Sequence, residues 1–252
     1  MIEVVEPGLY STIQDAGRDG WGHLGVRRAG AADPLALRAA NLLAGNTPQM
    51  PALEMTLLGG SFAFTADTLV GLAGADMTAT IVGQPRRLAP GASHLILAGS
   101  TLVFAGATDG ARAYLSVAGG FDVPTVLGSA ATDPVAGFGG AEGRTLLAGD
   151  VLVAGPDASM RERRWPSDVP SSGVSAPGSS VVVRVTEGPH VGALPEATRV
   201  SLTEQAWTVS TRADRVGLRL EGVPLRGAEA LDIVSMPMVP GAIQVPAGGQ
   251  PI

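Results

Sequence analysis

The chain of 252 residues contains no cysteine and no lysine, so arginine supplies all 17 of its basic side chains. Without cysteine it has no thiol nucleophile, no disulfide and no thiolate metal site. Without lysine it has no Schiff base, no phosphate-loop lysine and no covalently attached biotin, because each of these needs an ε-amine. Any such group has to come from another chain.

Basic charge is scarce overall, and the formal net charge is -6 at pH 7. General affinity for nucleic acid or for an anionic membrane needs a basic excess, so neither partner is expected. The N-terminal sequence has no basic start and no apolar stretch of signal-peptide length. Glycine, proline and charged residues interrupt every apolar run before it reaches membrane-spanning length. We therefore expect a cytoplasmic protein.

Histidine is rare as well. His23, His94 and His190 are the only three, and no two of them have a helical ligand spacing such as i and i+4. No metal site is therefore expected. His94 precedes an apolar strand and is expected to be structural, which leaves His23 as the histidine to consider for chemistry.

Glycine and proline are abundant, with 35 and 19 copies, and only one segment has a strong helical pattern. This composition predicts a mainly β fold with one or two short helices. Strands are predicted from alternating or apolar runs at residues 61–65, 94–106 (two strands about Gly99-Ser100), 112–120 and 181–188. Sheets this short need closure or a second layer to bury their faces, so barrel or sandwich units are expected.

One helix is predicted to begin after Asp33. The Asp33 carboxylate can accept from the first free amides of a helix, and Pro34 suits the first helical position because its missing N–H is not needed there. Gly45-Asn46 supplies a stop signal. The face predicted to be buried comprises Leu35, Ala39, Leu42 and Leu43. A second short helix is predicted over residues 195–203.

A Pro/Ser/Gly-rich segment at residues 165–180 separates two parts of the chain. It predicts an N-terminal β-barrel-containing domain over residues 1–164, a linker over 165–180 and a second β-barrel domain over 181–252. The alternative is a long surface loop within one domain.

The first candidate site lies in STIQDAGRDGWGHLG, residues 11–25, where glycines alternate with polar side chains. Arg18 can bind a carboxylate or phosphate with two parallel hydrogen bonds, and Asp15 or His23 can move a proton. Gln14 can both donate and accept. The alternative is that Asp15 and Arg18 pair with each other or hold turn amides.

The second candidate site follows Arg112 and contains several glycines. Successive backbone amides at Gly119, Gly120 and Gly139 can converge on an oxyanion, although turns between strands explain the same glycines. The run from Gly137 fails the dinucleotide-binding fingerprint, because Glu142 occupies the third glycine position. No G-x-S-x-G sequence is present, which disfavours a classical serine hydrolase.

The third candidate site is near the C-terminal end. Arg215, Gly217, Arg219 and Glu221 have the two-residue spacing of one face of a strand, which is usually a solvated face. Asp214 precedes this row. Gln244 lies between prolines, where ligand binding and turn support are equally open.

Six segments of the chain resemble one bacterial family. They are GLYSTIQD (8–15), LEMTLLGG (53–60), RAYLSVAGG (112–120), GFGG (137–140), DRVGLRLEG (214–222) and GAIQVPAGGQPI (241–252). The family is the second allophanate-hydrolase-type subunit, also described as the biotin-dependent carboxyltransferase-like C subunit of 5-oxoprolinase and as the Kip antagonist. The resemblance implies tandem cyclophilin-like β-barrel modules and an active site shared with a sister subunit.

The resemblance also implies roles for the candidate residues. The catalytic set is Asp15, Arg18, His23 and Asp214. The substrate-binding set is Gln14, Arg112, Arg215 and Gln244. Family members usually continue beyond the GQPI segment, so the second barrel is expected to be C-terminally incomplete.

The activity implied is the ATP-dependent opening of a cyclic amide, 5-oxoproline, to glutamate. ATP with Mg²⁺ would be held together with a partner, which is sister subunit 1, and a third, lactam-binding subunit is a further implied partner. One alternative is the carboxyltransferase subunit of a urea or allophanate-type enzyme, with biotin carried on another chain. The other is a regulatory subunit that binds a sister protein which inhibits a kinase.

Overall fold

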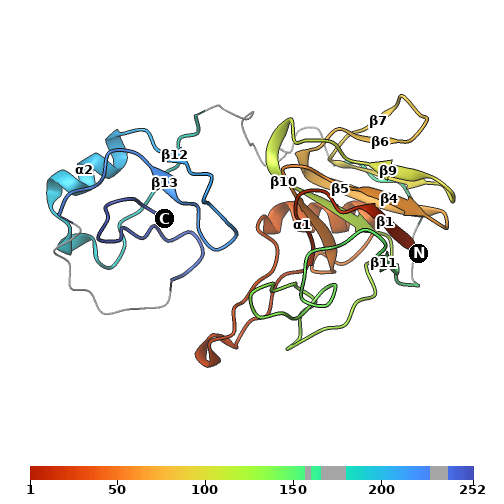
Figure 1. The fold of residues 1–252 in the computed structure, drawn as a ribbon, viewed down its shortest axis with the longest axis horizontal. Coiled ribbons are helices and arrows are strands. Elements are labelled where there is room, and N and C mark those ends of the chain that lie inside the picture. The colour runs from red at the N-terminus through yellow and green to blue at the C-terminus, as the bar shows by residue number, and fades with distance from the viewer. Residues whose placement is uncertain (157–159, 166–179, 228–237) are drawn as a thin grey trace. The chain divides into compact units, whose positions relative to one another are not determined.

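The computed structural model describes residues 1–156, 160–165, 180–227 and 238–252. The chain divides into two compact units, Met1–Val181 and Val182–Ile252, shown in Figure 1. Residues 166–179 of the predicted linker lie outside the described residues, so its role as a linker stays a prediction.

The first unit contains two antiparallel sheets (Figure 1). One has six strands in the order β11 (Val151–Leu152), β1 (Ile2–Glu6), β4 (Ser61–Phe64), β9 (Thr101–Val103), β6 (Ala79–Ile81) and β7 (Arg87–Leu88). The other has five strands in the order β2 (Ser11–Gln14), β3 (Ala52–Thr56), β10 (Asp109–Val117), β5 (Thr68–Asp76) and β8 (Ala92–Ile96). The mainly β prediction is confirmed. In the described residues neither sheet closes on itself, so the expected barrel is observed as open sheets.

Apolar side chains at alternate positions of the strands form the main core. Phe62 and Phe64 are 0% and 1% exposed, as their period-two spacing predicts, and the Phe62 ring meets Phe104 edge to face at 6.1 Å. In the five-stranded sheet, the alternate residues Leu53, Met55, Val70, Leu72, Leu115 and Val117 belong to the same buried cluster. The other face of that sheet is therefore left for a helix to cover.

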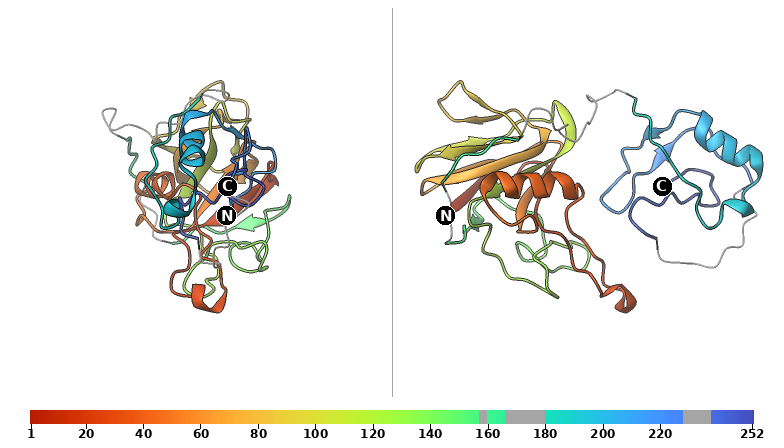
Figure 2. Two further views of the ribbon diagram at one scale, coloured as in Figure 1. Left: turned by 90° about the vertical axis from the view of Figure 1, so that its left-hand side faces the viewer. Right: turned by 180° about the vertical axis from the view of Figure 1, so that it is seen from behind.

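Helix α1 (Pro34–Ala44) covers this second face (Figure 2, right). Its ends are as predicted: the Asp33 carboxylate accepts from the amides of Leu35 and Ala36, both at 3.0 Å, and Gly45 ends the helix at φ 88°.

The predicted buried face of α1 is wrong for Leu35 and Leu42 and right for Leu43, and Ala39 is partly buried against the helix–sheet cluster. Leu35 and Leu42 are 67% and 45% exposed, and the helix instead buries Ala36, Leu37, Ala40, Leu43 and Ala44. The reason lies on the sheet, where a Cβ on Gly71 would overlap the carbonyl of Ala40 and lie 2.7 Å from the Ala44 amide nitrogen. The helix approaches so closely that its alanine side fits and its leucines at 35 and 42 do not.

Two further strand predictions have different outcomes. Residues 94–106 do contain parts of two strands, β8 and β9, but these belong to different sheets. The strand predicted over residues 181–188 is wrong, because no strand is formed there.

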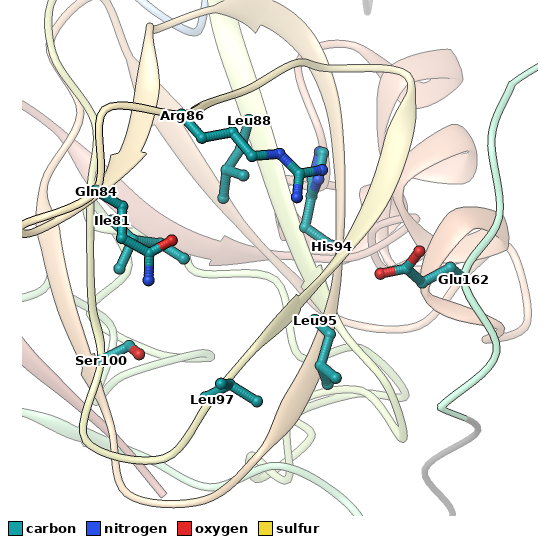
Figure 3. Close-up of a pocket in the computed structure, with 9 residues that line it drawn as sticks. All are labelled: Ile81, Gln84, Arg86, Leu88, His94, Leu95, Leu97, Ser100 and Glu162. Atoms are coloured by element: carbon teal, nitrogen blue, oxygen red, sulfur yellow. The ribbon is translucent and has the colours of Figure 1, made fainter.

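Strands β7 and β8 are edge strands of the two different sheets. A cavity of about 110 Å³ is lined by residues of both strands (Figure 3). Its lining includes Leu88 from β7, His94 from β8, Arg86 and Glu162. His94 Nε2 donates to the Ala89 carbonyl at 2.9 Å. Burial lowers the pKa of His94, and this effect outweighs the contribution of that hydrogen bond.

The second unit contains η2 (Val191–Ala193), α2 (Glu196–Glu204), β12 (Thr208–Val209) and β13 (Leu220–Glu221). Helix α2 agrees with the prediction for residues 195–203. Within residues 182–227 and 238–252, the pair β12–β13 is the one sheet that is formed. In the part of the chain that the structure describes, no helix is long and apolar enough to cross a membrane.

Candidate functional site

A loop of residues 17–30 projects from the first unit and carries η1 (Gly22–Leu24) at its tip (Figure 2). Its base is closed by the Arg18 amide donating to the Arg28 carbonyl at 2.8 Å and by the Ala31 amide donating to the Asp15 carbonyl at 2.9 Å. Gly17 has φ 90°, and a Cβ on it would lie 2.9 Å from two carbonyl oxygens of the opposite arm. The close approach of the two arms therefore needs glycine.

Asp15 joins the base of this loop to a distant segment. One carboxylate oxygen accepts from the Gly17 amide at 2.8 Å and from the Ser129 hydroxyl at 2.6 Å, and the other accepts from the Ala130 amide at 2.7 Å. The side chain is 8% exposed. Three donors engage this carboxylate, so its first role here is to hold turn amides, which is the alternative that the sequence left open.

Arg18 lies beside the same segment and is 2% exposed. Its Nη2 donates to the Ala131 carbonyl, its Nε donates to the Val126 carbonyl at 3.4 Å, and its guanidinium carbon lies 4.7 Å from the centre of the Phe138 ring. Within the described residues no carboxylate lies within ion-pair distance of Arg18. Asp15 and Arg18 therefore do not pair.

Gln14, the last residue of β2, is fully buried. Its amide nitrogen donates to the Thr12 hydroxyl at 3.0 Å and to the Thr132 carbonyl at 3.1 Å. The structure thus brings three predicted residues, Gln14, Asp15 and Arg18, against one segment, residues 129–133.

Sequence reasoning placed this segment, with Ser129, in the second candidate site that follows Arg112, and did not connect it with the loop at residues 11–25. Residues 129–133 run along β2, where the Thr132 amide donates to the Ile13 carbonyl at 2.9 Å, and Gly140 donates back to Ala130 at 2.7 Å. The one available signal was Asp133 followed by Pro134, which is typical of a turn.

His23 does not join this group. It lies in η1, at the exposed tip of the loop, and its Nδ1 is 3.0 Å from the Gly20 carbonyl. Arg18 lies at the buried base of the same loop. A proton-transfer role for His23 would therefore act on a partner or ligand outside this cluster.

Arg112, on β10, forms an ion pair with Glu54, its Nε lying 3.6 Å from Oε1. The Glu54 side chain is fully buried, and its other oxygen accepts from the Tyr114 hydroxyl at 2.7 Å and the Ala32 amide at 2.9 Å. Arg112 therefore balances a buried charge within the fold.

The three glycines predicted to bind an anion do not share one environment. The Gly119 amide donates to Asn46 Oδ1 at 2.9 Å and the Gly120 amide donates to the Val117 carbonyl at 2.8 Å, so the fold uses both amides. Gly139 instead packs against Arg18, and a Cβ there would lie 3.0 Å from Nη2. The turn explanation therefore describes Gly119 and Gly120 better than the oxyanion explanation.

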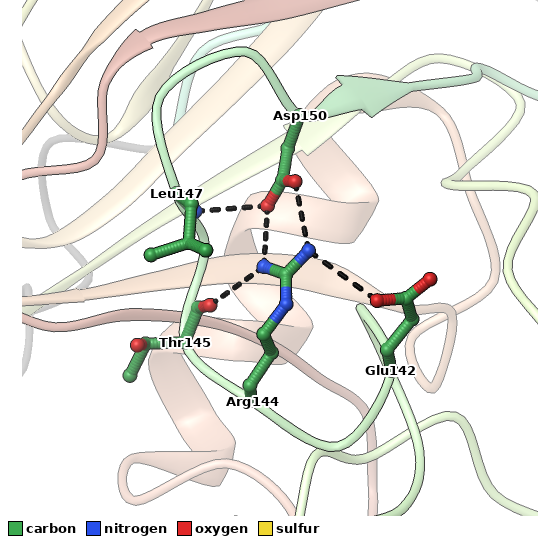
Figure 4. A network of polar contacts seen from close by, with 5 residues as sticks. All are labelled: Glu142, Arg144, Thr145, Leu147 and Asp150. Atoms are coloured by element: carbon green, nitrogen blue, oxygen red, sulfur yellow. Dashed lines mark hydrogen bonds and ion pairs between the residues drawn. The ribbon is translucent and has the colours of Figure 1, made fainter.

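A second arginine, Arg144, follows the segment 129–133 in the sequence and is held in a tight turn (Figure 4). Its two terminal nitrogens donate to the two oxygens of Asp150 at 2.7 and 2.9 Å, and Leu147 donates its amide to the same carboxylate at 2.8 Å. The hydrogen bonds from Arg144 hold the pKa of Asp150 below its usual range. This pair is structural.

The remaining predicted residues belong to the second unit. Asp214 accepts from the amides of Val216 at 2.8 Å and Gly217 at 3.1 Å, so it closes a turn, and the predicted strand from Arg215 is wrong except for residues 220 and 221. The Gln244 backbone pairs with Ile252, with N···O distances of 3.0 and 2.9 Å, and its side chain is exposed.

The chemical groups of the first unit suit the binding of a small polar molecule. Arg18 supplies a buried cation, Gln14 supplies an amide and Asp15 fixes the backbone around them. In the described residues no group of three or more His, Asp or Glu side chains is arranged to hold a metal ion.

Comparison with known proteins identifies the class. Residues 24–252 match the family model described as the carboxyltransferase domain, subdomains A and B. The chain therefore belongs to the carboxyltransferase-domain family, and the resemblance seen in the sequence is confirmed.

Individual relatives narrow this class. The chain is 36% identical over 252 residues to the C subunit of 5-oxoprolinase from Escherichia coli, covering all of this chain and 78% of that protein. It is 35% identical over 228 residues to urea amidolyase of Saccharomyces cerevisiae, covering 88% of this chain and 12% of that protein.

Solved structures give the same result. The crystal structure of TTHA0988 has a TM-score of 0.83 at 34% identity, covering 99% of this chain and 48% of the other. The urea amidolyase of K. lactis has a TM-score of 0.80 at 30% identity, covering 99% of this chain and 16% of the other. The chain thus spans about half of the TTHA0988 chain.

Proposed function

We propose that the protein is the C-type component of an ATP-dependent 5-oxoprolinase and acts with a sister subunit of the allophanate-hydrolase subunit 1 type. The observation that carries this is the similarity to the C subunit of 5-oxoprolinase over the whole chain, which covers most of that relative. The similarity to urea amidolyase covers a small part of a much larger protein. The relative of comparable extent is the better guide to the complete function.

The chemistry of the reaction requires cationic side chains at the substrate. A lactam is unreactive toward water, so its oxygen has to be activated by phosphorylation before the ring opens, and cationic side chains stabilise the charge that develops. Arg18, buried beside Gln14, is the residue of the first unit that we assign to substrate. Asp15 positions the loop that carries it.

ATP does not fit the residues of this chain that were candidates for a phosphate site. The chain has no lysine, and the amides of Gly119 and Gly120 already donate within the fold. We therefore assign ATP with its Mg²⁺ to a partner subunit, and the substrate contacts to this chain. The complex would be cytoplasmic, with a third, lactam-binding subunit as a further component.

The test is reconstitution with the two presumed partner subunits. The measurement is ADP release with and without 5-oxoproline, together with glutamate formation, and with this chain omitted as control. Lactam-dependent ADP release with matching glutamate, lost when this chain is omitted, is the expected result. A complex that forms but releases no ADP in response to the lactam would overturn the proposal.

A second candidate function is carboxyl transfer to a urea-type substrate, favoured by the family description and the urea amidolyases. Biotin would then be carried on another chain, because no lysine is present here. This candidate predicts activity only with a biotinylated carrier and bicarbonate.

A further inference from the structure

Three buried polar atoms of side chains that meet at the segment 131–133 have no hydrogen-bond partner among the described residues. They are Gln14 Oε1, Arg18 Nη1 and Asp133 Oδ2, on side chains that belong to residues 0%, 2% and 3% exposed. Buried polar atoms in folded proteins almost always have a partner. Three such atoms in one place therefore require an explanation.

Their proximity follows from the segment 131–133. Arg18 donates through Nη2 to the Ala131 carbonyl, and Gln14 donates through Nε2 to the Thr132 carbonyl at 3.1 Å. Asp133 is the next residue. Ala131 thus holds Arg18 and Thr132 holds Gln14, while Asp133 itself carries the third unpartnered atom.

The three side chains are prevented from satisfying one another. Asp133 uses its other oxygen to accept from the amides of Val135 at 3.1 Å and Ala136 at 3.2 Å. Arg18 is fixed by its bond to Ala131 and by the Phe138 ring. In the part of the chain that is described, no ion pair joins Arg18 and Asp133, although both are buried.

We propose that Gln14 Oε1, Arg18 Nη1 and Asp133 Oδ2 form a binding site for a small molecule that carries both an oxygen acceptor and an N–H donor. Arg18 donates to the ligand oxygen, while Gln14 and Asp133 accept its N–H groups. This is the chemistry of an amide, a lactam or a urea. A fully deprotonated oxyanion such as sulfate offers no donor for Asp133 and is repelled by it.

Gly139 forms part of the wall of this site. A Cβ on Gly139 would overlap the Ala131 carbonyl and lie 3.0 Å from Arg18 Nη2. The glycine therefore allows the guanidinium to reach its position.

The choice of probe rests on the proposed function, whose substrate, 5-oxoproline, has a ring N–H, a lactam carbonyl oxygen and a carboxylate. We would titrate the purified full-length protein with 5-oxoproline by calorimetry. The matched ligand is the corresponding lactone, in which a ring oxygen replaces the N–H. A site that hydrogen-bonds an N–H discriminates strongly against an analogue that lacks it. We expect the lactam to bind at least about 10-fold more tightly than the lactone.

Asp133→Asn places a donor where the ligand needs an acceptor and keeps an oxygen for the two turn amides. This substitution is expected to weaken lactam binding about 10-fold or more. It should also reduce the difference in affinity between the lactam and the lactone. Glu142→Gln is the matched acid-to-amide control, because the Glu142 side chain is 84% exposed. It should bind as the wild type does.

Equal binding of lactam and lactone, binding of neither, or an Asp133→Asn variant that behaves like the control would overturn the inference. The lactam–lactone comparison uses the wild-type protein, so it decides the question even if the variant does not fold. Turnover in the reconstituted complex without donor-dependent binding here would overturn this inference alone. Donor-dependent binding without turnover would instead count against the proposed function.

Discussion

The Tyr114 hydroxyl donates to the buried Glu54 carboxylate at 2.7 Å and accepts from the Asp33 amide at 2.8 Å. Asp33 is the residue that caps α1, so one hydroxyl ties the start of the helix to a strand of the sheet beneath it. Burial first, and the neighbouring Glu54 charge next, raise the pKa of Tyr114 far above its ordinary value. The hydroxyl therefore stays protonated and remains a donor.

Removal of this hydroxyl should destabilise the fold. In Tyr114→Phe the Glu54 carboxylate loses a donor and the Asp33 amide loses its acceptor, which we expect to cost about 1–3 kcal/mol of unfolding free energy. The measurement is urea denaturation. Tyr10→Phe, at the other tyrosine, is the matched control and should change stability little. Equal effects of the two substitutions would show that the network is not stabilising.

The approach of α1 to the sheet should not tolerate a methyl group at Gly71. A Cβ there would lie 2.7 Å from the Ala44 amide nitrogen and 3.0 Å from Leu43 Cβ, as well as overlapping Ala40. Gly71→Ala is expected to cost roughly 1–3 kcal/mol or more, because the helix has to move outward. In Gly106→Ala no atom lies within 4 Å of the new Cβ, so this control should be near neutral in the same denaturation experiment.

These two contacts explain why some features could be predicted from the sequence and others could not. The ends of α1 depend on Asp33, Pro34 and Gly45, which act within one turn of the helix, and they were predicted correctly. The buried face depends on Gly71, which is distant in sequence, and that prediction was wrong. A pattern that is periodic in the helix cannot reveal which strand residue allows close contact.

The same division applies to the candidate site. Gln14, Asp15 and Arg18 were identified because glycines and polar residues alternate in one short segment. Their partners at 129–133 are more than 100 positions away and lack a motif, and Asp15 meets Ser129 across a separation of 114 residues. Arg112 was assigned to substrate because its buried partner, Glu54, is a tertiary contact that no spacing indicates.

The stability of the protein should fall as the pH drops below 6.5, in part because of His94. Burial holds the pKa of His94 below the ordinary value of 6.5 in the folded state. The unfolded state therefore binds this proton more readily, and the free energy of unfolding decreases as the pH falls from 6.5 until folded His94 also titrates. An NMR titration of the ring should give a midpoint below 6.5. His94→Asn should remove this part of the pH dependence, whereas His190→Asn, at an exposed histidine, should retain it.

The Arg144–Asp150 ion pair should contribute to the stability of the fold only at pH values where Asp150 is ionised. The pKa of Asp150 is held below its ordinary value of 3.8, chiefly by the hydrogen bonds from Arg144. Its contribution is present above pH 3.8 and is lost as the pH falls through the lower folded pKa. We expect Arg144→Gln to reduce stability by about 0.2–1 kcal/mol at neutral pH, since both groups are partly exposed, and to have less effect in acid. Arg28→Gln, in a more exposed pair, should have a smaller effect at every pH.

Substitution of Arg18 should separate its structural contribution from its contribution to turnover. Arg18→Met keeps an unbranched apolar side chain against Phe138 but removes the bond to Ala131 and the charge. We expect a loss of about 1–3 kcal/mol in unfolding free energy, since the Ala131 carbonyl is left buried without this donor. Turnover in the reconstituted complex should be abolished at temperatures where the variant is still folded, because the buried cation is gone.

The matched control is Arg27→Met, in the exposed part of the same projecting loop, which should leave both stability and turnover close to wild type. Arg18→Lys completes the series, because it keeps a positive charge but lacks the planar fork that holds Ala131 while Nη1 faces the ligand. We expect it to fold better than Arg18→Met and still to lose most of the turnover. A folded Arg18→Met protein with wild-type turnover would show that Arg18 is only a structural residue and that substrate binds elsewhere.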